Sequence, residues 1–84
     1  MEIVMVDLQP WTGILSDGVT EVTYPSYGCT VQECNDLNLY EIADGEDLIV
    51  YMNGSEMLVQ RRDRRWHFLD LETDERFCIR EIIY

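Results

Sequence analysis

The second half of the chain alternates apolar runs with turn residues, and this pattern most constrains the fold. Asn53-Gly54 separates the apolar runs 48–52 and 57–59. Asn-Gly between two such runs is the strongest short-range hairpin signal, because both residues accept the positive φ of a type I′ turn. Further turns are expected at Arg62-Asp63-Arg64 and at Glu72-Thr73-Asp74-Glu75. Residues 47–84 therefore predict four strands joined as an antiparallel meander.

These turns also predict which side chains share a face of the sheet, because side chains alternate along a strand. A turn centred on Thr73-Asp74 would place Phe68 opposite Ile79. One face would then carry Trp66, Phe68, Phe77 and Ile79, and the other Leu69, Leu71, Cys78 and Ile82. A two-residue turn at Asn53-Gly54 would group Leu48, Val50, Met57 and Val59 against Ile49, Tyr51 and Leu58.

Both faces of the predicted sheet are therefore apolar in part. Such a sheet must be covered twice, curl into a small barrel, or serve as a contact surface. The turn at 62–64 can be two or three residues long, and a one-residue difference exchanges the faces of the strand that follows. This register stays open at the level of the sequence.

The first half of the chain predicts two further strands and one short helix. Segments 2–8 and 19–24 are rich in β-branched residues, and segments 9–13 and 25–28 are expected to end them, since each contains a proline. Thr30 and Glu33 have the spacing of a capping box, which predicts a helix over 31–38. Residues 39–42 extend this helix or begin another strand. A turn over 43–46 leads into the meander.

Together these elements predict one α+β domain over residues 1–84: a mostly antiparallel β meander with one short helix, and a curled, barrel-like sheet as the main variant. A chain of 84 residues, 46% of them apolar, is long enough for one globular core. No apolar run is long enough to span a membrane. The first seven residues carry two acids and no base, unlike a signal peptide, so we expect a cytoplasmic protein.

Charge is the most unusual property of the chain. There are 17 acidic side chains against six basic ones, and the net charge is −11. All six bases are arginines at or after position 61, so the excess of acid belongs to the first 60 residues. Charge of this density opposes direct binding to nucleic acid, whose affinity comes largely from Lys and Arg on phosphates. We expect the arginines near one turn to pair instead with acids of the first half: Arg61, Arg62, Arg64 and Arg65.

Cysteine and histidine supply candidate metal ligands, but not in a favourable pattern. Cys29, Cys34, His67 and Cys78 could form a zinc set. Structural zinc ligands usually come in closely spaced pairs, however, and His67 and Cys78 are far apart. The acidic run 44–47 lacks the spacing of a calcium loop. We predict no metal and no cofactor. We expect reduced thiols, with Cys34 and Cys78 in the core and Cys29 more exposed in a turn.

The sequence also contains no recognisable catalytic arrangement. His67 is the only histidine, so any Cys–His pair would have to use it. In the predicted register Cys78 shares a face with His67 without lying directly opposite. Nothing in the chain resembles a nucleophile elbow or an oxyanion loop. We therefore predict that the protein is not an enzyme.

The acidic surface then carries the predicted function, that of a small non-enzymatic module that inhibits or regulates a protein partner. Carboxylates spaced like backbone phosphates can occupy the basic groove of a nucleic-acid-binding protein, and such association is fast and salt-sensitive. Inhibitors borne by phages and other mobile elements have this size and charge. The candidate partner-binding residues are Glu33, Asp36, Glu41, Asp44, Glu46 and Asp47. The alternative is an assembly subunit that associates through the apolar faces of its sheet, and the oligomeric state stays open.

Overall fold

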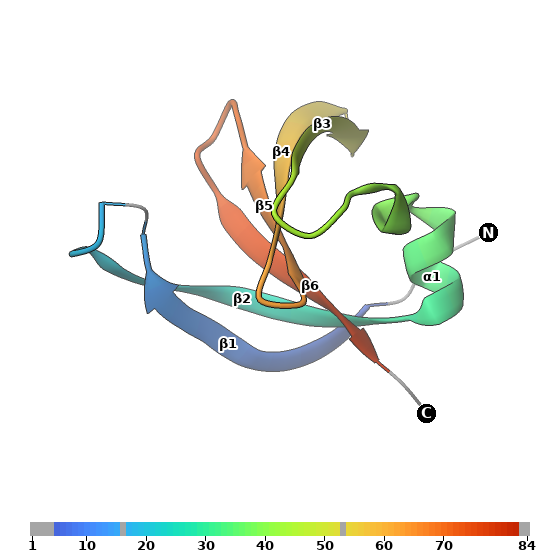
Figure 1. Cartoon of the computed structure of the whole chain (residues 1–84), viewed down its shortest axis with the longest axis horizontal. Coiled ribbons are helices and arrows are strands. Elements are labelled where there is room, and N and C mark those ends of the chain that lie inside the picture. Colours follow the sequence, from blue (N-terminus) through green and yellow to red (C-terminus); the bar gives the residue numbers. More distant parts are fainter. Residues whose placement is uncertain (1–4, 16, 53, 83–84) are drawn as a thin grey trace.

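The computed structural model describes residues 5–15, 17–52 and 54–82. Its strands form one sheet in the order β1-β2-β6-β5-β4-β3 (Figure 1). The elements are β1 (Val6–Ile14), β2 (Glu21–Thr30), α1 (Val31–Asp36), the 3₁₀ helix η1 (Leu39–Glu41), β3 (Asp47–Met52), β4 (Ser55–Arg62), β5 (Arg65–Asp70) and β6 (Arg76–Ile82). The predicted mostly-β architecture with one short helix is confirmed.

The predicted antiparallel meander is confirmed as β3 to β6, but the sheet differs from the prediction in two details. The sheet is mixed, because β2 and β6 run parallel while the other neighbours are antiparallel. The sheet is also open, since its edge strands β1 and β3 do not pair with each other. A parallel pair needs a long crossover. Here the crossover is the whole segment from α1 to β5, which lets β6 insert between β2 and β5.

The first two turns of the meander are both two residues long, as the residues in them favour. Met52 pairs with Ser55, so the β3–β4 hairpin has the predicted register. Gly54 has a φ of 80°, and Asn53 lies outside the described residues. Arg62 pairs with Arg65 across a two-residue turn in which both central residues have positive φ, as a type I′ turn requires. This turn decides the register that the sequence left open.

The third turn shifts the predicted pairing. Phe68 lies opposite Phe77, not opposite Ile79. The carboxylate of Asp70 accepts hydrogen bonds from two loop amides, at 2.8 and 3.1 Å, and Asp74 adopts a φ of 65°, so the loop is longer than a two-residue turn. The shift is two residues. Because side chains alternate with a period of two, the predicted faces are kept although the pairing was wrong.

Both N-terminal strands run through the prolines that were expected to end them. Pro10 lies where the β1–β2 register shifts, between Leu8 and Trp11. A bulge in an edge strand tolerates a residue without an N–H. Pro25 is tolerated in β2 because pairing with β6 begins only at the next residue, Ser26. Residues 2–4 of the predicted first strand lie outside the described part of the chain.

The predicted helix and its capping box are confirmed. The Glu33 amide donates to Thr30 Oγ1 at 3.2 Å, and the Thr30 amide donates to Glu33 Oε1 at 2.9 Å. Residues 39–41, for which the sequence left two possibilities, form the 3₁₀ helix η1. Among the described residues, no helix has the length and apolar character needed to cross a membrane.

The core lies between one face of the sheet and the segment from α1 to η1. This core face carries Val59, Trp66, Phe68 and Ile79, all at most 1% exposed. The phenyl rings of Phe68 and Phe77 stack with centroids 4.7 Å apart. The indole nitrogen of Trp66 donates to the Leu39 carbonyl at 2.9 Å, which fastens η1 to the sheet. The other side of the sheet, here called the open face, carries Tyr24, His67 and Cys78.

Candidate functional site

The structure divides the six predicted partner-binding acids into two groups. Glu33 and Asp36 lie on α1 and Glu41 on η1, while Asp44, Glu46 and Asp47 come together where the chain enters β3. Five of the six are exposed. Glu33 is half-buried because its carboxylate caps the helix. Its role in the capping box gives this residue a structural function in addition to any contact with a partner.

One arginine of the expected cluster forms an ion pair with these acids. Arg62 Nη2 lies 2.8 Å from Asp47 Oδ1, with both side chains exposed. Arg62 Nη1 also donates to the Glu46 carbonyl at 3.1 Å. Arg61 instead places its guanidinium 3.9 Å from the centroid of the Trp66 ring. An exposed ion pair contributes only about 0–1 kcal/mol, so Arg62 serves mainly to hold the entry of β3 in place.

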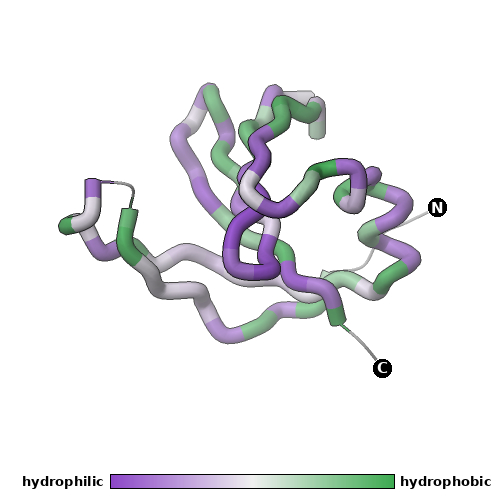
Figure 2. The backbone as a smooth tube through the Cα atoms, in the orientation of Figure 1, coloured by the Kyte–Doolittle hydropathy of each residue, from purple (hydrophilic) through white to green (hydrophobic). Residues whose placement is uncertain are grey.

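β3 is an edge strand with exposed apolar side chains. Leu48, Ile49 and Tyr51 are 44%, 52% and 75% exposed. Figure 2 shows hydrophobic residues on this strand beside the hydrophilic chain that leads into it. Isolated exposed apolar residues are ordinary on protein surfaces, but Ile49 and Tyr51 share one face of a strand whose outer edge is unpaired, and such a group marks a contact surface. The sequence predicted the apolar character of both faces and could not show that β3 lies at an edge.

The backbone of β3 also offers free hydrogen-bonding groups. The Arg61 amide donates to the Glu46 carbonyl at 3.0 Å, so the pair at residue 46 is hydrogen-bonded to β4. Bonded and non-bonded pairs alternate along an antiparallel ladder. Asp47, Ile49 and Tyr51 therefore direct their N–H and C=O groups away from β4, toward the free edge.

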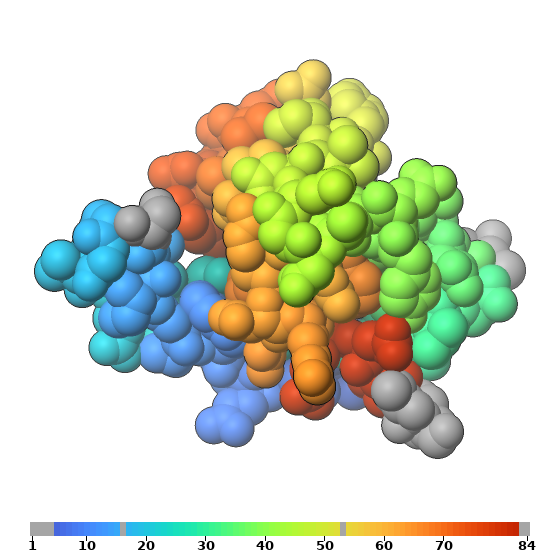
Figure 3. All heavy atoms as spheres, in the orientation of Figure 1, coloured from blue at the N-terminus to red at the C-terminus, as the bar shows by residue number. Residues whose placement is uncertain are grey.

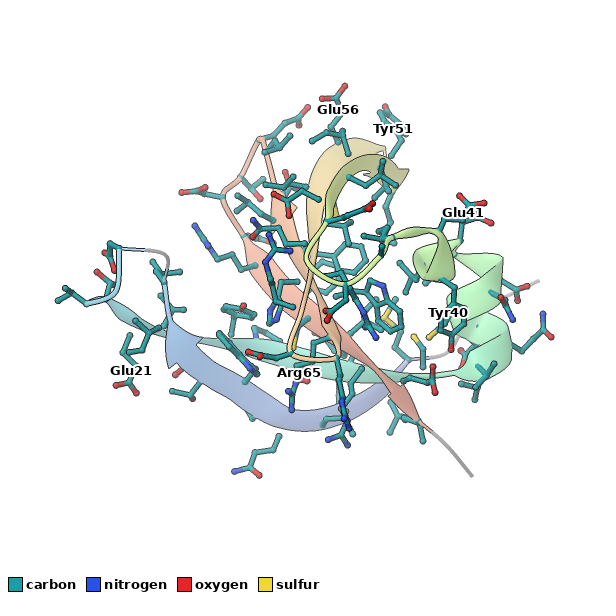
Figure 4. All side chains as sticks on the ribbon, in the orientation of Figure 1. Glu21, Tyr40, Glu41, Tyr51, Glu56 and Arg65 are labelled. Atoms are coloured by element: carbon teal, nitrogen blue, oxygen red, sulfur yellow. The ribbon has the colours of Figure 1, made fainter. Side chains whose placement is uncertain are left out.

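A further acid at this edge was missed from the sequence. Glu56 pairs with Tyr51 across the β3–β4 hairpin, and the two lie together at the top of the molecule (Figure 4). The signal that could have found it was present, because the two-residue turn at Asn53-Gly54 already implies this pairing. The edge strand is thus bordered by carboxylates at both ends, Asp47 at its start and Glu56 near its end.

The open face contains a recess of about 630 Å³ beside an aromatic cluster. Figure 3 shows the hollow between the β1–β2 lobe and the later strands. The Trp11 ring lies 4.8 Å from His67 and 5.0 Å from Tyr24. The Tyr24 hydroxyl and His67 Nδ1 are 2.7 Å apart, within hydrogen-bond distance. Burial raises the pKa of Tyr24 to about 12 and lowers the pKa of His67, so both groups favour their neutral forms here.

The cysteines do not come together as the zinc site considered from the sequence would require. Cys29 and Cys34 lie on the side of the core, while Cys78 and His67 belong to the open face. Cys29 is fully buried in β2, so the prediction of a more exposed turn position was wrong. Within the described ranges, no group of three or more His, Cys, Asp and Glu side chains could hold a metal.

Cys78 lies directly opposite His67, which corrects the predicted register of this pair. The thiol of Cys78 is instead within hydrogen-bond distance of the Ser26 hydroxyl, at 3.3 Å. Burial raises the pKa of Cys78. A reactive cysteine needs the opposite shift, toward the thiolate, and some exposure. We therefore interpret the contact of Cys78 with His67 as packing on the open face.

No protein-family model, curated protein or solved structure matches this chain. The interpretation of the site rests on its own geometry.

Proposed function

We propose that this chain is a non-enzymatic protein-binding module that engages a basic protein partner through the edge strand β3 and the carboxylates around it. One observation carries the proposal: β3 combines exposed apolar side chains with unpaired backbone groups on an edge bordered by acids. An inhibitor or regulator of the partner is the role that such a module would serve.

The backbone argument concerns strand addition. An extended segment of a partner can pair with an exposed sheet edge, where main-chain hydrogen bonds give affinity and side-chain contacts give specificity. Asp47, Ile49 and Tyr51 direct three N–H and C=O pairs toward such a segment. Tyr51 and Ile49 supply apolar contact area beside those bonds. Aromatic residues are favoured as binding anchors because they bury a large area at little entropic cost.

The charge argument concerns the kind of partner. Asp44, Glu46, Asp47 and Glu56 surround the edge, in a chain of net charge −11. A basic segment gains steering and complementarity from these carboxylates, since opposite potentials raise the association rate. A protein whose basic groove normally holds nucleic acid fits this requirement, because the carboxylates would stand in for phosphates.

An assembly subunit is the second candidate, and the same apolar side chains favour it. Leu48, Ile49 and Tyr51 could equally cover a second copy of the chain. Two copies that meet along β3 would bring like charges together, however, and this repulsion weakens with added salt. Measuring the mass of the protein in solution at low and high salt separates the candidates: a binding module stays monomeric, whereas an assembly subunit self-associates.

The test of the binding module uses two matched sets of neutral substitutions. The first changes Asp44→Asn, Glu46→Gln and Asp47→Asn. The control changes Glu72→Gln, Asp74→Asn and Glu75→Gln in the exposed β5–β6 loop, which removes the same charge at the opposite end of the strands from Asp44, Glu46 and Asp47. Binding is measured against a purified partner first recovered from the native host.

We expect the first set to lower the association rate at low salt by about tenfold and to flatten its salt dependence, because rim charges act mainly on steering. The control set should change the rate much less. Equal effects of the two sets would mean that only the net charge matters. An unchanged rate and salt slope in the first set would refute the proposed acidic site.

A separate variant tests strand addition. Ile49→Pro removes an N–H that faces the free edge without removing a bond to β4. We expect it to preserve the fold while increasing the dissociation rate from the partner, because strand addition depends on main-chain bonds. Binding that survives this change unaltered would mean that the edge is not used.

A further inference from the structure

Two arginines face each other across β5 and β6 on the open face. Arg65 pairs directly with Arg80 in the ladder. Like charges in this position destabilise a sheet. In the part of the chain that the structure describes, the only ion pair within 4 Å joins Arg62 to Asp47, so neither Arg65 nor Arg80 is neutralised by a described carboxylate. This arrangement is unexpected in a chain with 17 acids.

Arg65 is also incompletely satisfied. Its Nη1 donates to the Asp63 carbonyl at 3.3 Å, but its Nε is buried and has no hydrogen-bond partner. A buried N–H of a charged group that lacks an acceptor costs more than a neutral one. The missing interaction is an acceptor on the side of the sheet where Arg80 supplies a second cation.

A recess of about 440 Å³ opens at this pair. The β1 bulge and β2 form its other walls, and Figure 4 places Arg65 where the β4–β5 turn approaches these strands. The volume lies within the range of about 300–1,000 Å³ that small-ligand sites occupy.

The charged side chains that line this recess are both arginines. Arg65 and Arg80 can only donate. The Ser26 hydroxyl is buried and lies 3.3 Å from the Cys78 thiol, from which it can accept, so its own proton is available to a ligand. The positive charge of Arg65 also acts on His67: burial lowers the pKa of His67, and the nearby Arg65 guanidinium lowers it further. The lining contains no carboxylate.

We infer that this recess binds a phosphate group, held between Arg65 and Arg80 with the Ser26 hydroxyl as a third donor. The planar guanidinium fork matches the oxygens of a phosphate and binds them by short, charge-assisted bonds. The bound phosphate would accept from the Arg65 guanidinium and would remove the repulsion between the two arginines. The site is built on β1, β2, β5 and β6, so it is independent of the β3 edge.

Two sources of the phosphate are compatible with this chemistry, an inorganic phosphate ion and a nucleoside monophosphate. Trp11 lines the recess and is half-buried. An aromatic ring beside the anion site can add contact with a base. A nucleotide should therefore bind more tightly than inorganic phosphate if it is the natural ligand, and this difference should depend on Trp11.

The experiment measures the binding of inorganic phosphate by calorimetry, with sodium chloride adjusted to keep the ionic strength constant. Arg80→Gln is the informative variant, because Arg80 is exposed and its replacement should not disturb the core. Arg64→Gln is the control, since Arg64 lies in the adjacent turn, carries the same charge and does not line the recess. Circular dichroism verifies that both variants fold.

We expect Arg80→Gln to weaken phosphate binding by about tenfold or more, the equivalent of one charge-assisted hydrogen bond, while Arg64→Gln has little effect. Adenosine monophosphate that binds more tightly than phosphate, with the gain lost in Trp11→Ala, would identify a nucleotide ligand. Equal affinities would identify the free ion.

Two results would overturn the inference. The first is the absence of measurable binding at 10 mM phosphate, about ten times the Kd of a weak millimolar site. The second is an equal loss in the Arg80 and Arg64 variants, which would mean that phosphate only screens the general charge. Neutralising Asp44, Glu46 and Asp47 should not weaken phosphate binding, so a failure here is distinguishable from a failure of the β3 proposal.

Discussion

Trp66 is the residue whose replacement most directly tests the packing of this fold. It is 1% exposed, and its indole N–H is bonded to the Leu39 carbonyl. The Arg61 guanidinium lies over one face of the ring, and Tyr40 contacts it in an edge arrangement, with centroids 5.6 Å apart. Trp66→Phe keeps an aromatic ring but removes the donor and reduces the buried volume.

The magnitude follows from the groups that are lost. The Leu39 carbonyl keeps its bond from the Ile42 amide, so the loss of the Trp66 donor costs about 0.5–1.5 kcal/mol, the net value of one hydrogen bond. The missing ring atoms add about 1–2 kcal/mol at about 0.8 kcal/mol for each buried carbon. The contact with Arg61 also weakens, since Trp is a better cation–π partner than Phe. We expect Trp66→Phe to lower the free energy of unfolding by about 1.5–4 kcal/mol, a large part of the stability of a domain of this size.

The assay is urea unfolding followed by far-UV circular dichroism, which does not depend on the tryptophan that is removed. The matched control is Trp11→Phe, because Trp11 is only half-buried and should lose less than about 1.5 kcal/mol. Hydrogen exchange provides a second measurement. The Ile42 amide, bonded to the Leu39 carbonyl at 3.2 Å, should exchange faster once Trp66 no longer holds η1.

Equal losses of stability in the two variants would refute the reasoning, because they would show that the buried bond to Leu39 adds nothing. A loss below about 0.5 kcal/mol in Trp66→Phe would mean that the site repacks freely. Unchanged exchange at Ile42 would mean that η1 is held by other contacts.

Two further predictions concern the open face. Gly28→Ala should destabilise the protein by about 1–3 kcal/mol, because an added Cβ would lie 2.1 Å from Ile82 Cδ1. Thermal unfolding should show that the double variant Gly28→Ala with Ile82→Ala recovers part of the lost stability. No recovery would mean that the strain does not come from contact with Ile82. Burial lowers the pKa of His67 below its ordinary value of 6.5, so the unfolded chain binds the proton more readily and stability should fall as the pH drops through about 6.5. His67→Gln should flatten this part of the stability profile, and an unaltered profile would assign it to other groups.

Much of the local structure could be predicted because its determinants lie within a few residues. The helix begins directly after Thr30 because the side chains of Thr30 and Glu33 each accept a hydrogen bond from the other residue's amide. The β3–β4 hairpin has its predicted register because a two-residue Asn-Gly turn is compatible with only one pairing. The faces of β5 and β6 were also correct, since an error of two residues does not alter the alternation of side chains.

The candidate sites depend on contacts that no local pattern encodes. The sequence identified the acids near β3, yet their proximity to free backbone groups exists only because β3 is the last strand of the sheet. Arg65 and Arg80 could not be paired in advance, because the third turn was longer than predicted. Cys29 was misplaced for a related reason: Gly28 and its neighbours suggested a turn, but pairing with β6 keeps this segment extended.

The sequence by itself determined the strands of the meander, the capped helix and the asymmetry of charge, all of which follow from backbone preferences and composition. Only the tertiary structure decided that β6 lies between β2 and β5 and that Pro10 and Pro25 are part of strands. It also decided that Arg65 and Arg80 lie opposite each other beside the β1 bulge. These features depend on which pairing of distant segments lowers the free energy of the folded chain most. That free energy includes the closure of a long crossover and the burial of Ile79 and Trp66 beneath η1, and it is a property of the assembled core rather than of any stretch of the chain.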